Sequence, residues 1–180
     1  PPAAARDVAA YVDGGGTLVI AAADNGSANR LLATVGATAR VNGTPLRDET
    51  EHGPSPDFPR GRVVGTHPAV DGAEELMLNH GSAVTPGQAR VLVRASQFAY
   101  LDSDRDGRIS SDEAPARYPI MTAESVGEGE VIVISDPSAF INVMLDEADN
   151  RRVLSNLFES GDRVVFDLSH VGGVPPFALG

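Results

Sequence analysis

The residues best suited to chemistry lie in one acidic segment, residues 102–113, which reads DSDRDGRISSDE. This order matches the twelve-residue calcium loop of the EF-hand type, D-x-[DN]-x-[DN]-G followed by Glu at the last position. A hard dication takes six to eight oxygen ligands at about 2.3–2.6 Å, and this spacing delivers them from a single loop. The sequence therefore predicts that Ca²⁺ binds here.

Every ligand position of this loop holds a residue of the required type. The predicted ligands are, in loop order, Asp102, Asp104, Asp106, the backbone carbonyl of Arg108, Ser110 directly or through water, and Glu113 with both carboxylate oxygens. Gly107 supplies the sharp turn, and Ile109 is expected to pin the loop to the core. A merely solvated acidic turn is the alternative, and the complete spacing argues against it.

The flanks of the loop differ from those of a helix–loop–helix sensor. Residues 89–100 have the pattern of a strand, and Pro115 and Pro119 interrupt any helix that follows. We therefore expect an insertion, residues 97–118, in which the ion has a structural role because no pair of helices is present to open.

A second candidate site lies after two segments predicted to be buried strands, residues 17–23 and 130–135. In open α/β sheets, ligands bind at the carboxyl ends of strands, where helix N-termini also favour anions. The residues that would form this crevice are Asp24, Asn25, Ser27, Asp136, Ser138 and Asn142. The favoured alternative is that Asp136 or Ser138 caps the helix predicted at 138–147.

Composition excludes several classes of function. The chain has 180 residues, with 25 Asp and Glu against 14 basic residues that are all Arg, and its formal net charge is −11. An acidic chain lacks the electrostatic footprint of a nucleic-acid-binding protein. The absence of Cys excludes disulfides, thiolate metal sites and a cysteine nucleophile. The acidity without Lys fits either adaptation to high salt or a codon bias.

Strands alternate with helices near both ends of the chain, which predicts an α/β fold with a mostly parallel sheet. The middle of the chain is richer in strands, and we expect an antiparallel portion or a hairpin there. Predicted helices are 3–13, 28–36, 138–147 and 149–160. Predicted strands are 17–23, 37–42, 62–66, 74–79, 89–100, 118–126, 130–135 and 163–168, and residues 47–60 are predicted to be a surface loop. We expect one domain, residues 1–170, followed by a tail, residues 171–180. No apolar run of about 20 residues is present in the sequence.

Four stretches carry a resemblance to a known family: YVDGGGTLVIAA, NRLLATVGA, RASQFAYLDSDRDGRISSDE and GEGEVIVISDPSAFINVML. Together they resemble uncharacterised, membrane-anchored prokaryotic proteins, with acidic versions in halophilic archaea. The soluble domain of that family is similar to glutamine-amidotransferase-like, flavodoxin-like domains of gliding-motility and ABC-transporter accessory proteins. The resemblance implies a three-layer flavodoxin-like sandwich, a membrane helix that the tail 171–180 approaches in a longer protein, and MoxR-type ATPases or von Willebrand-type proteins as partners. The abundance of calcium outside cells favours an extracytoplasmic position.

Two functions are carried forward, beside a third hypothesis of a small-ligand sensor in which calcium reports the extracellular milieu. The first is a non-catalytic, membrane-tethered binding or scaffold domain stabilised by a calcium ion, because amidotransferases need the Cys that this chain lacks. The alternative is a hydrolase that uses Asp, Ser and His groups at the strand ends. The order of residues permits a Ser138–His170–Asp167 triad, but Ser138 does not sit in a G-x-S-x-G elbow.

Overall fold

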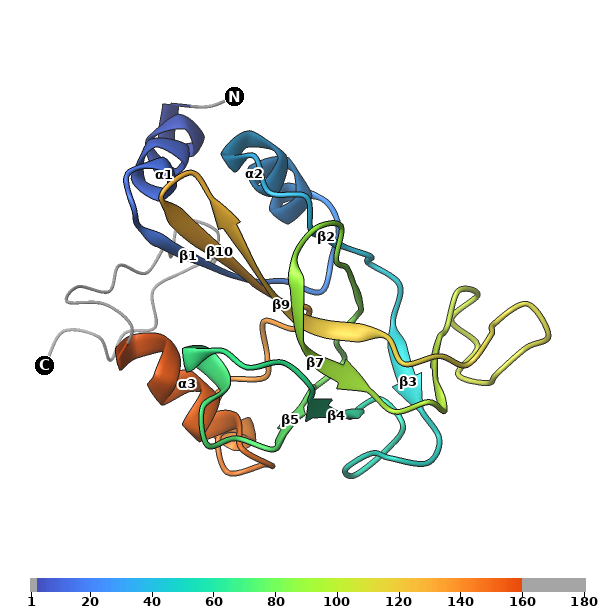
Figure 1. The fold of residues 1–180 in the computed structure, drawn as a ribbon. Coiled ribbons are helices and arrows are strands. Elements are labelled where there is room, and N and C mark those ends of the chain that lie inside the picture. The colour runs from blue at the N-terminus through green and yellow to red at the C-terminus, as the bar shows by residue number, and fades with distance from the viewer. Residues whose placement is uncertain (1–2, 160–180) are drawn as a thin grey trace, which may run out of the picture.

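The computed structural model describes residues 3–159, and its largest element is a six-stranded sheet with the order β1-β10-β9-β7-β4-β5 (Figure 1). Its strands are β1 (Thr17–Ala21), β4 (Arg60–Val63), β5 (Glu75–Met77), β7 (Arg90–Ala95), β9 (Pro119–Val126) and β10 (Gly129–Ile134). β1 runs parallel to β10, whereas every other neighbouring pair in this sheet is antiparallel. The sheet is therefore mixed and mostly antiparallel.

Two small sheets of two strands lie beside the main one. β2 (Arg40–Val41) pairs with β6 (Val84–Thr85), and β3 (Leu46–Asp48) pairs with β8 (Ala99–Leu101), both antiparallel. The second of these matters most for function, because the predicted calcium loop begins at the residue that follows β8.

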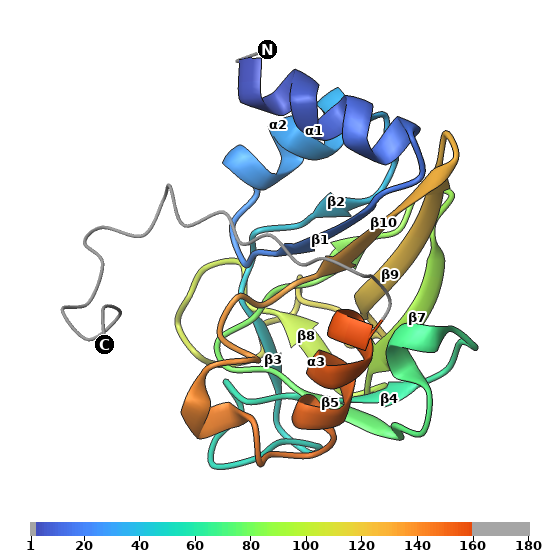
Figure 2. The same ribbon diagram turned by 90° about the vertical axis from the view of Figure 1, so that its left-hand side faces the viewer.

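Helices lie on both sides of the main sheet (Figure 2). They are α1 (Ala3–Asp13), α2 (Ser27–Val35) and α3 (Asn150–Glu159), and the short 3₁₀ turns are η1 (Pro68–Val70) and η2 (Asn142–Met144). Gly36 ends α2 in the left-handed conformation, with φ of +87°, and its amide donates to the carbonyl of Ala33. This is the helix end that glycine favours.

β10 shows how the core is divided. Val131 and Val133 point into an apolar cluster shared with α1 and α2, whereas Ile132 and Ile134 point into a second cluster shared with α3. Successive side chains of a strand alternate between faces, so β10 is buried on both. That double burial explains the continuous apolar run VIVI at residues 131–134.

The prediction of a flavodoxin-like (amidotransferase-like) three-layer sandwich with a mostly parallel sheet is wrong. Only one strand pair in the main sheet is parallel, and the middle of the chain forms an antiparallel arrangement through β4, β5, β7 and β9. The physical reason is that a doubly buried apolar strand looks the same in either direction. Apolar content reports burial on both faces, and it does not report the direction of the neighbouring strand.

The predicted helix at 138–147 is also wrong. This segment consists of turns with the short η2, and its β-branched residues Ile141 and Val143 are 45% and 76% exposed. They therefore do not form the buried stripe that a helix needs for stabilisation. The predicted surface loop 47–60 instead contains parts of β3 and β4. The predicted strand at 163–168 and the tail at 171–180 lie outside the described residues.

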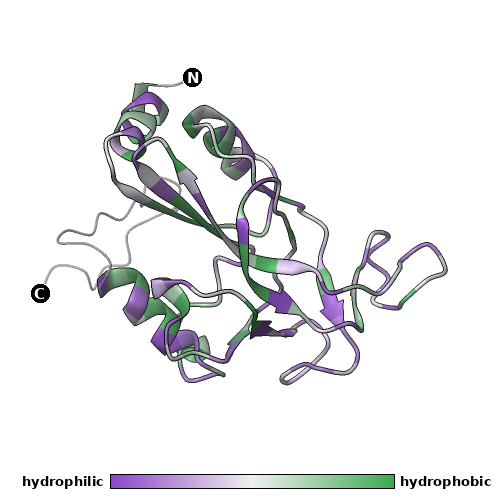
Figure 3. Ribbon diagram, viewed as in Figure 1, coloured by the Kyte–Doolittle hydropathy of each residue, from purple (hydrophilic) through white to green (hydrophobic). Residues whose placement is uncertain are grey.

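Hydropathy follows this arrangement. Apolar residues concentrate in the central strands and in the facing sides of the helices, and the projecting segment between β8 and β9 is largely hydrophilic (Figure 3). Between residues 3 and 159, no helix combines the length and the apolar character of a membrane span.

Candidate metal centre

The candidate metal centre is anchored at the end of strand β8. Leu101, the last residue of β8, lies opposite Leu46 of β3, and the amide of Asp102 donates to the carbonyl of Pro45 over 2.9 Å. The backbone of the first predicted ligand is thus fixed by the β3–β8 sheet. The loop then projects from the body of the molecule and returns to β9 (Figure 1).

Three carboxylates of the loop converge. One oxygen from each of Asp102, Asp104 and Asp106 lies within 4.8 Å of those of the other two. Amides of the loop fix two of these side chains, since the Asp106 amide donates to Asp104 Oδ1 over 3.1 Å and the Arg108 amide donates to Asp106 Oδ1 over 2.8 Å. Gly107 has φ of +75°, as the sharp turn requires. Such an all-oxygen donor set suits a hard cation such as Ca²⁺.

Asp102 differs from the other two in its burial. It is 4% exposed, whereas Asp104 and Asp106 are exposed. Its Oδ2 accepts a hydrogen bond from the Gly107 amide, but its Oδ1 is buried and has no hydrogen-bond partner in the described structure. Buried polar atoms are nearly always hydrogen-bonded, and an exception calls for an explanation, such as a bound ion or water. The Oδ1 atom therefore fits the role of a metal ligand.

Glu113 closes the loop from its other end and is 5% exposed. Its Oε1 accepts from the Ser103 amide over 2.5 Å and from the Ser103 hydroxyl over 3.0 Å, and its Oε2 accepts from the Ser110 amide over 3.1 Å. Burial disfavours the charged form, but these hydrogen bonds outweigh it and lower the pKa of Glu113. Glu113 is not among the three clustered carboxylates, so ligation would require it to exchange these bonds for the ion.

Ser110 has its hydroxyl turned toward a neighbour. The hydroxyl donates to Asp112 Oδ1 over 2.7 Å, which leaves the oxygen lone pairs available to an ion or a water. Ile109 does not fulfil its expected role. It is 48% exposed and belongs to neither apolar cluster, because the loop projects away from the core.

A polar network behind the loop was not predicted from the sequence. Arg47 of β3 lies opposite Tyr100 of β8, forms an ion pair with Asp57, donates to the Tyr100 hydroxyl over 3.2 Å and lies 3.9 Å from Asp102 Oδ2. Burial opposes the charge of Arg47, but Tyr100 and Asp57 outweigh it and raise its pKa. Burial also raises the pKa of Tyr100, whose hydroxyl donates to Glu49 over 3.1 Å. The network can be seen only in the structure, where the three-residue strands β3 and β8 pair and bring Arg47 beside Tyr100.

Five of the six predicted crevice residues lie within six residues of the ends of β1 and β10, which are side by side with Ala21 opposite Ile134. Asp24, Asn25 and Ser27 are exposed, and so is Asn142, whereas Asp136 is fully buried. Among residues 3–159, no hydrogen bond or ion pair joins the turn after β1 to the turn after β10. Asp167 and His170 of the possible triad with Ser138 lie outside the described residues.

Asp136 has a structural task instead. Its Oδ2 accepts from the Asn79 amide over 2.5 Å and its Oδ1 accepts from the Ser138 amide over 2.6 Å. The predicted cap is thus present as a turn, although no helix follows it. Burial raises the pKa of Asp136, and the two amides only partly offset this effect.

A hollow of about 360 Å³ lies elsewhere, beside His67 and Glu130. His67 Nε2 is 2.9 Å from Glu130 Oε1, and His67 Nδ1 accepts from the Ala69 amide over 3.1 Å. We assign the ring proton to Nε2, because Nδ1 must accept. Nδ1 of His67 is therefore engaged with η1 and Nε2 is engaged with Glu130, which leaves neither ring nitrogen available to act as a base.

Comparison with solved structures shows the fold that this chain shares with other proteins. The chain is similar to the N-terminal domain of mmIFT52, with a TM-score of 0.66 and 16% identity over 92% of this chain and 74% of that domain. A cytoplasmic protein of Salmonella typhimurium LT2 has a TM-score of 0.55 and 15% identity, over 88% of this chain and 60% of that protein.

A β-galactosidase from Rahnella sp. R3 has a TM-score of 0.53 and 12% identity, over 88% of this chain and 21% of the enzyme. These identities are too low to transfer an activity to this chain. The structural likeness to these proteins adds to the case against a flavodoxin-like sandwich. A search of curated proteins found no significant match.

A family model does match the sequence, over residues 1–158. Its description is a domain of unknown function, DUF4350, which agrees with the resemblance to an uncharacterised family. Because this match covers most of the chain, the protein belongs to the DUF4350 family.

Proposed function

We propose that this chain is a non-catalytic binding or scaffold domain whose 97–118 insertion is fastened by a calcium ion. The observation that carries the proposal is the buried, unpartnered Oδ1 of Asp102 beside two further carboxylates. The completeness of the loop motif supports the same ion, since the residue at each ligand position is of the required type.

Electrostatics explains why an ion would stabilise this region. Three carboxylates within 4.8 Å of one another repel, and the repulsion is strongest for Asp102 because burial weakens the screening by water. Arg47 stands 3.9 Å from Asp102 Oδ2 but is already paired with Asp57. A dication among the three carboxylates converts the repulsion into attraction and satisfies Oδ1.

The experiment is thermal unfolding of the 180-residue chain after treatment with a chelator, with and without added Ca²⁺. We expect Ca²⁺ to raise Tm, and excess chelator to reverse the rise. Mg²⁺ is the control, because it demands near-ideal octahedral geometry and should stabilise less. An unchanged Tm at saturating calcium concentrations would remove the basis of the proposal.

The wider role of the domain rests on the family resemblance. We propose that the full protein tethers this domain to a membrane on its extracytoplasmic side, where calcium is abundant, in a salt-adapted prokaryote. MoxR-type ATPases or von Willebrand-type proteins are the proposed partners, and affinity capture of the full-length protein with its encoded neighbours tests this. A hydrolase remains the alternative. Asp136 accepts from the Ser138 amide and interacts electrostatically with His80, but among residues 3–159 no hydrogen bond joins the Ser138 hydroxyl to a His.

A further inference from the structure

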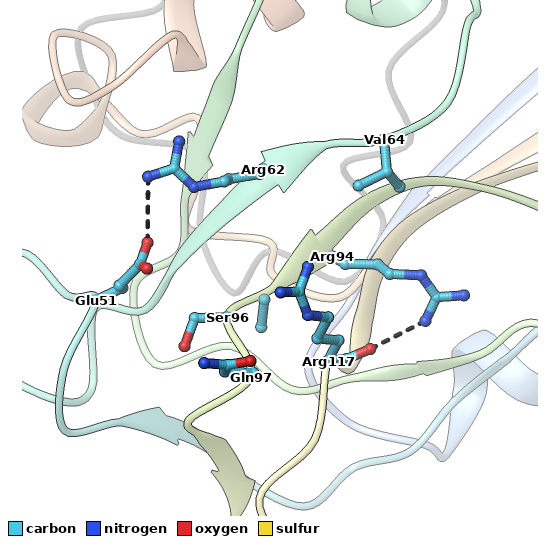
Figure 4. Close-up of a pocket in the computed structure, with 8 residues that line it drawn as sticks. Glu51, Arg62, Val64, Arg94, Ser96, Gln97 and Arg117 are labelled. Carbon is cyan, nitrogen blue, oxygen red and sulfur yellow. Dashed lines mark hydrogen bonds and ion pairs between the residues drawn. The ribbon is translucent and has the colours of Figure 1, made fainter.

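Three arginines gather around one small hollow on the face of the sheet. The hollow has a volume of about 90 Å³, and it is bordered by Arg62 of β4, Arg94 of β7 and Arg117, which precedes β9 (Figure 4). Arg62 and Arg94 are direct cross-strand partners. Like charges opposite each other destabilise a strand pair unless something neutralises them. Three Arg side chains around one small hollow are unexpected in a chain whose net charge is −11.

The protein neutralises only part of this charge. Arg62 pairs with Glu51 over 3.4 Å and with Glu75 over 3.3 Å. Arg94 donates to the backbone carbonyl of Arg117 over 2.9 Å. Among the described residues, neither Arg94 nor Arg117 has a carboxylate within ion-pair distance. The hollow thus keeps two guanidinium groups without a counter-charge.

The side chains have different tasks. In Figure 4, Arg117 lies between Arg62 and Gln97, whereas Arg94 turns away to meet the Arg117 carbonyl. Arg94 is therefore a positioning residue that holds the backbone of Arg117. Ser96 is already committed, since its hydroxyl donates to Asp48 and accepts from the Phe98 amide. The Arg94 guanidinium keeps further N–H donors but turns away, so the donors that face the hollow without a partner in the part of the chain that the structure describes are the Arg117 guanidinium and the Gln97 amide.

We propose that this hollow binds the oxyanion group of a ligand, a carboxylate or a phosphate, through Arg117 with help from Gln97. The planar guanidinium fork matches both groups with two parallel hydrogen bonds. The small volume admits one such group and not a whole nucleotide. The side chain of Val64, 54% exposed at the rim, offers apolar surface to the part of the ligand that carries the anion.

The test is an amide-resolved NMR titration of the 180-residue chain in calcium-containing buffer of low ionic strength. Sulfate serves as the tetrahedral probe because it leaves calcium in solution, and acetate serves as the carboxylate probe. We expect saturable shifts at the amides of Gln97 and Arg117. Preference for sulfate or for acetate identifies the phosphate or the carboxylate as the natural group, and either result supports the site.

The variants Arg117→Gln and Arg6→Gln separate a built site from general charge. Arg6 lies exposed on α1, so R6Q removes the same charge elsewhere. R117Q should weaken binding at least about tenfold, the factor expected for one charge-assisted hydrogen bond, while R6Q stays within about twofold of wild type, as for a remote screened charge. Equal weakening by both variants, or shifts that do not saturate in the wild-type chain, would overturn the proposal. The spectra of the two variants also report whether each is folded.

Discussion

The amide of Gly107 donates to Oδ2 of Asp102 over 3.1 Å, and this bond leaves the other oxygen of the same carboxylate buried and without a partner. The turn residue of the loop therefore orients its first ligand. Gly107 can do so because its φ of +75° brings the amide back toward the start of the loop. The loop is arranged around a carboxylate oxygen that has no hydrogen-bond partner among the described residues.

Replacement of Asp102 by Asn should have opposite effects in the two states of the protein. Without calcium, D102N removes a buried charge and its repulsion with Asp104 and Asp106, so Tm should equal or exceed that of the wild type. With calcium, the wild type should gain about 2.7 kcal/mol at a hundredfold excess over Kd, and D102N should gain almost none. Differential scanning calorimetry measures both effects.

Asp112→Asn is the matched control for that experiment. Asp112 belongs to the same loop and is exposed, but it does not occupy a predicted ligand position. Asn at this position keeps the Oδ1 atom that accepts from the Ser110 hydroxyl. D112N should keep the calcium response of the wild type. A calcium-induced rise in Tm that is as large in D102N as in D112N would remove Asp102 from the site.

Glu113 should make stability depend on pH in the acid range. Its pKa is lowered in the folded state, so it contributes stability above the pKa of the unfolded chain, and this contribution is lost as pH falls through the lowered value. In calcium-free urea unfolding between about pH 3 and 6, which brackets the ordinary Glu pKa, the wild type should lose stability more steeply than Glu113→Gln. Parallel curves for the two proteins would contradict the assignment.

Asp136 should act in the opposite sense. Burial raises its folded pKa, so its contribution is fully present below the unfolded pKa and declines as pH rises through the folded value. The difference in unfolding free energy between the wild type and Asp136→Asn should therefore shrink as pH increases from the unfolded-state pKa of Asp136 to its folded-state pKa. Denaturant unfolding at a series of pH values measures it, and a difference that grows with pH would show that the amides of Asn79 and Ser138 dominate instead.

Asn150, at the start of α3, should contribute strongly to the free energy of unfolding. Its side chain accepts from the Met77 amide and donates to the carbonyls of Met77 and Ala139, each over 2.9 Å. Asn150→Ala leaves these buried groups unpaired and should cost about 1–3 kcal/mol of unfolding free energy. Asn156→Ala, on the less buried part of the same helix, should cost less. An N150A variant as stable as the wild type would be incompatible with this role.

The calcium loop was accessible to sequence reasoning because its whole pattern lies within twelve consecutive residues. Asp102, Asp104 and Asp106 needed no knowledge of the fold to be grouped. The support behind them was not accessible, because Arg47 belongs to a stretch that was predicted as a surface loop. A three-residue strand such as β3 has too few alternations to stand out from a loop.

The direction of the strands was the second feature that sequence reasoning could not fully predict. The apolar run at β10 correctly indicated burial on both faces, whereas Val19 of β1 is 39% exposed, so the same prediction for β1 was wrong. The one parallel pair in the main sheet joins these two strands. The antiparallel middle depends on long-range pairing, such as that of Arg62 with Arg94, which leaves no local signal. For the same reason, the Arg117 hollow could not be predicted, since the residues that line it come from four separated segments.

The central claim is that calcium binds at Asp102, and isothermal titration calorimetry of the chelator-treated 180-residue chain tests it most directly. We predict a single saturable site in the wild type with Kd below about 1 mM, the weak limit for calcium modules. The D102N variant should give no saturable heat under the same conditions. A wild-type chain without a binding isotherm, or a D102N variant with the same isotherm as the wild type, would contradict the account.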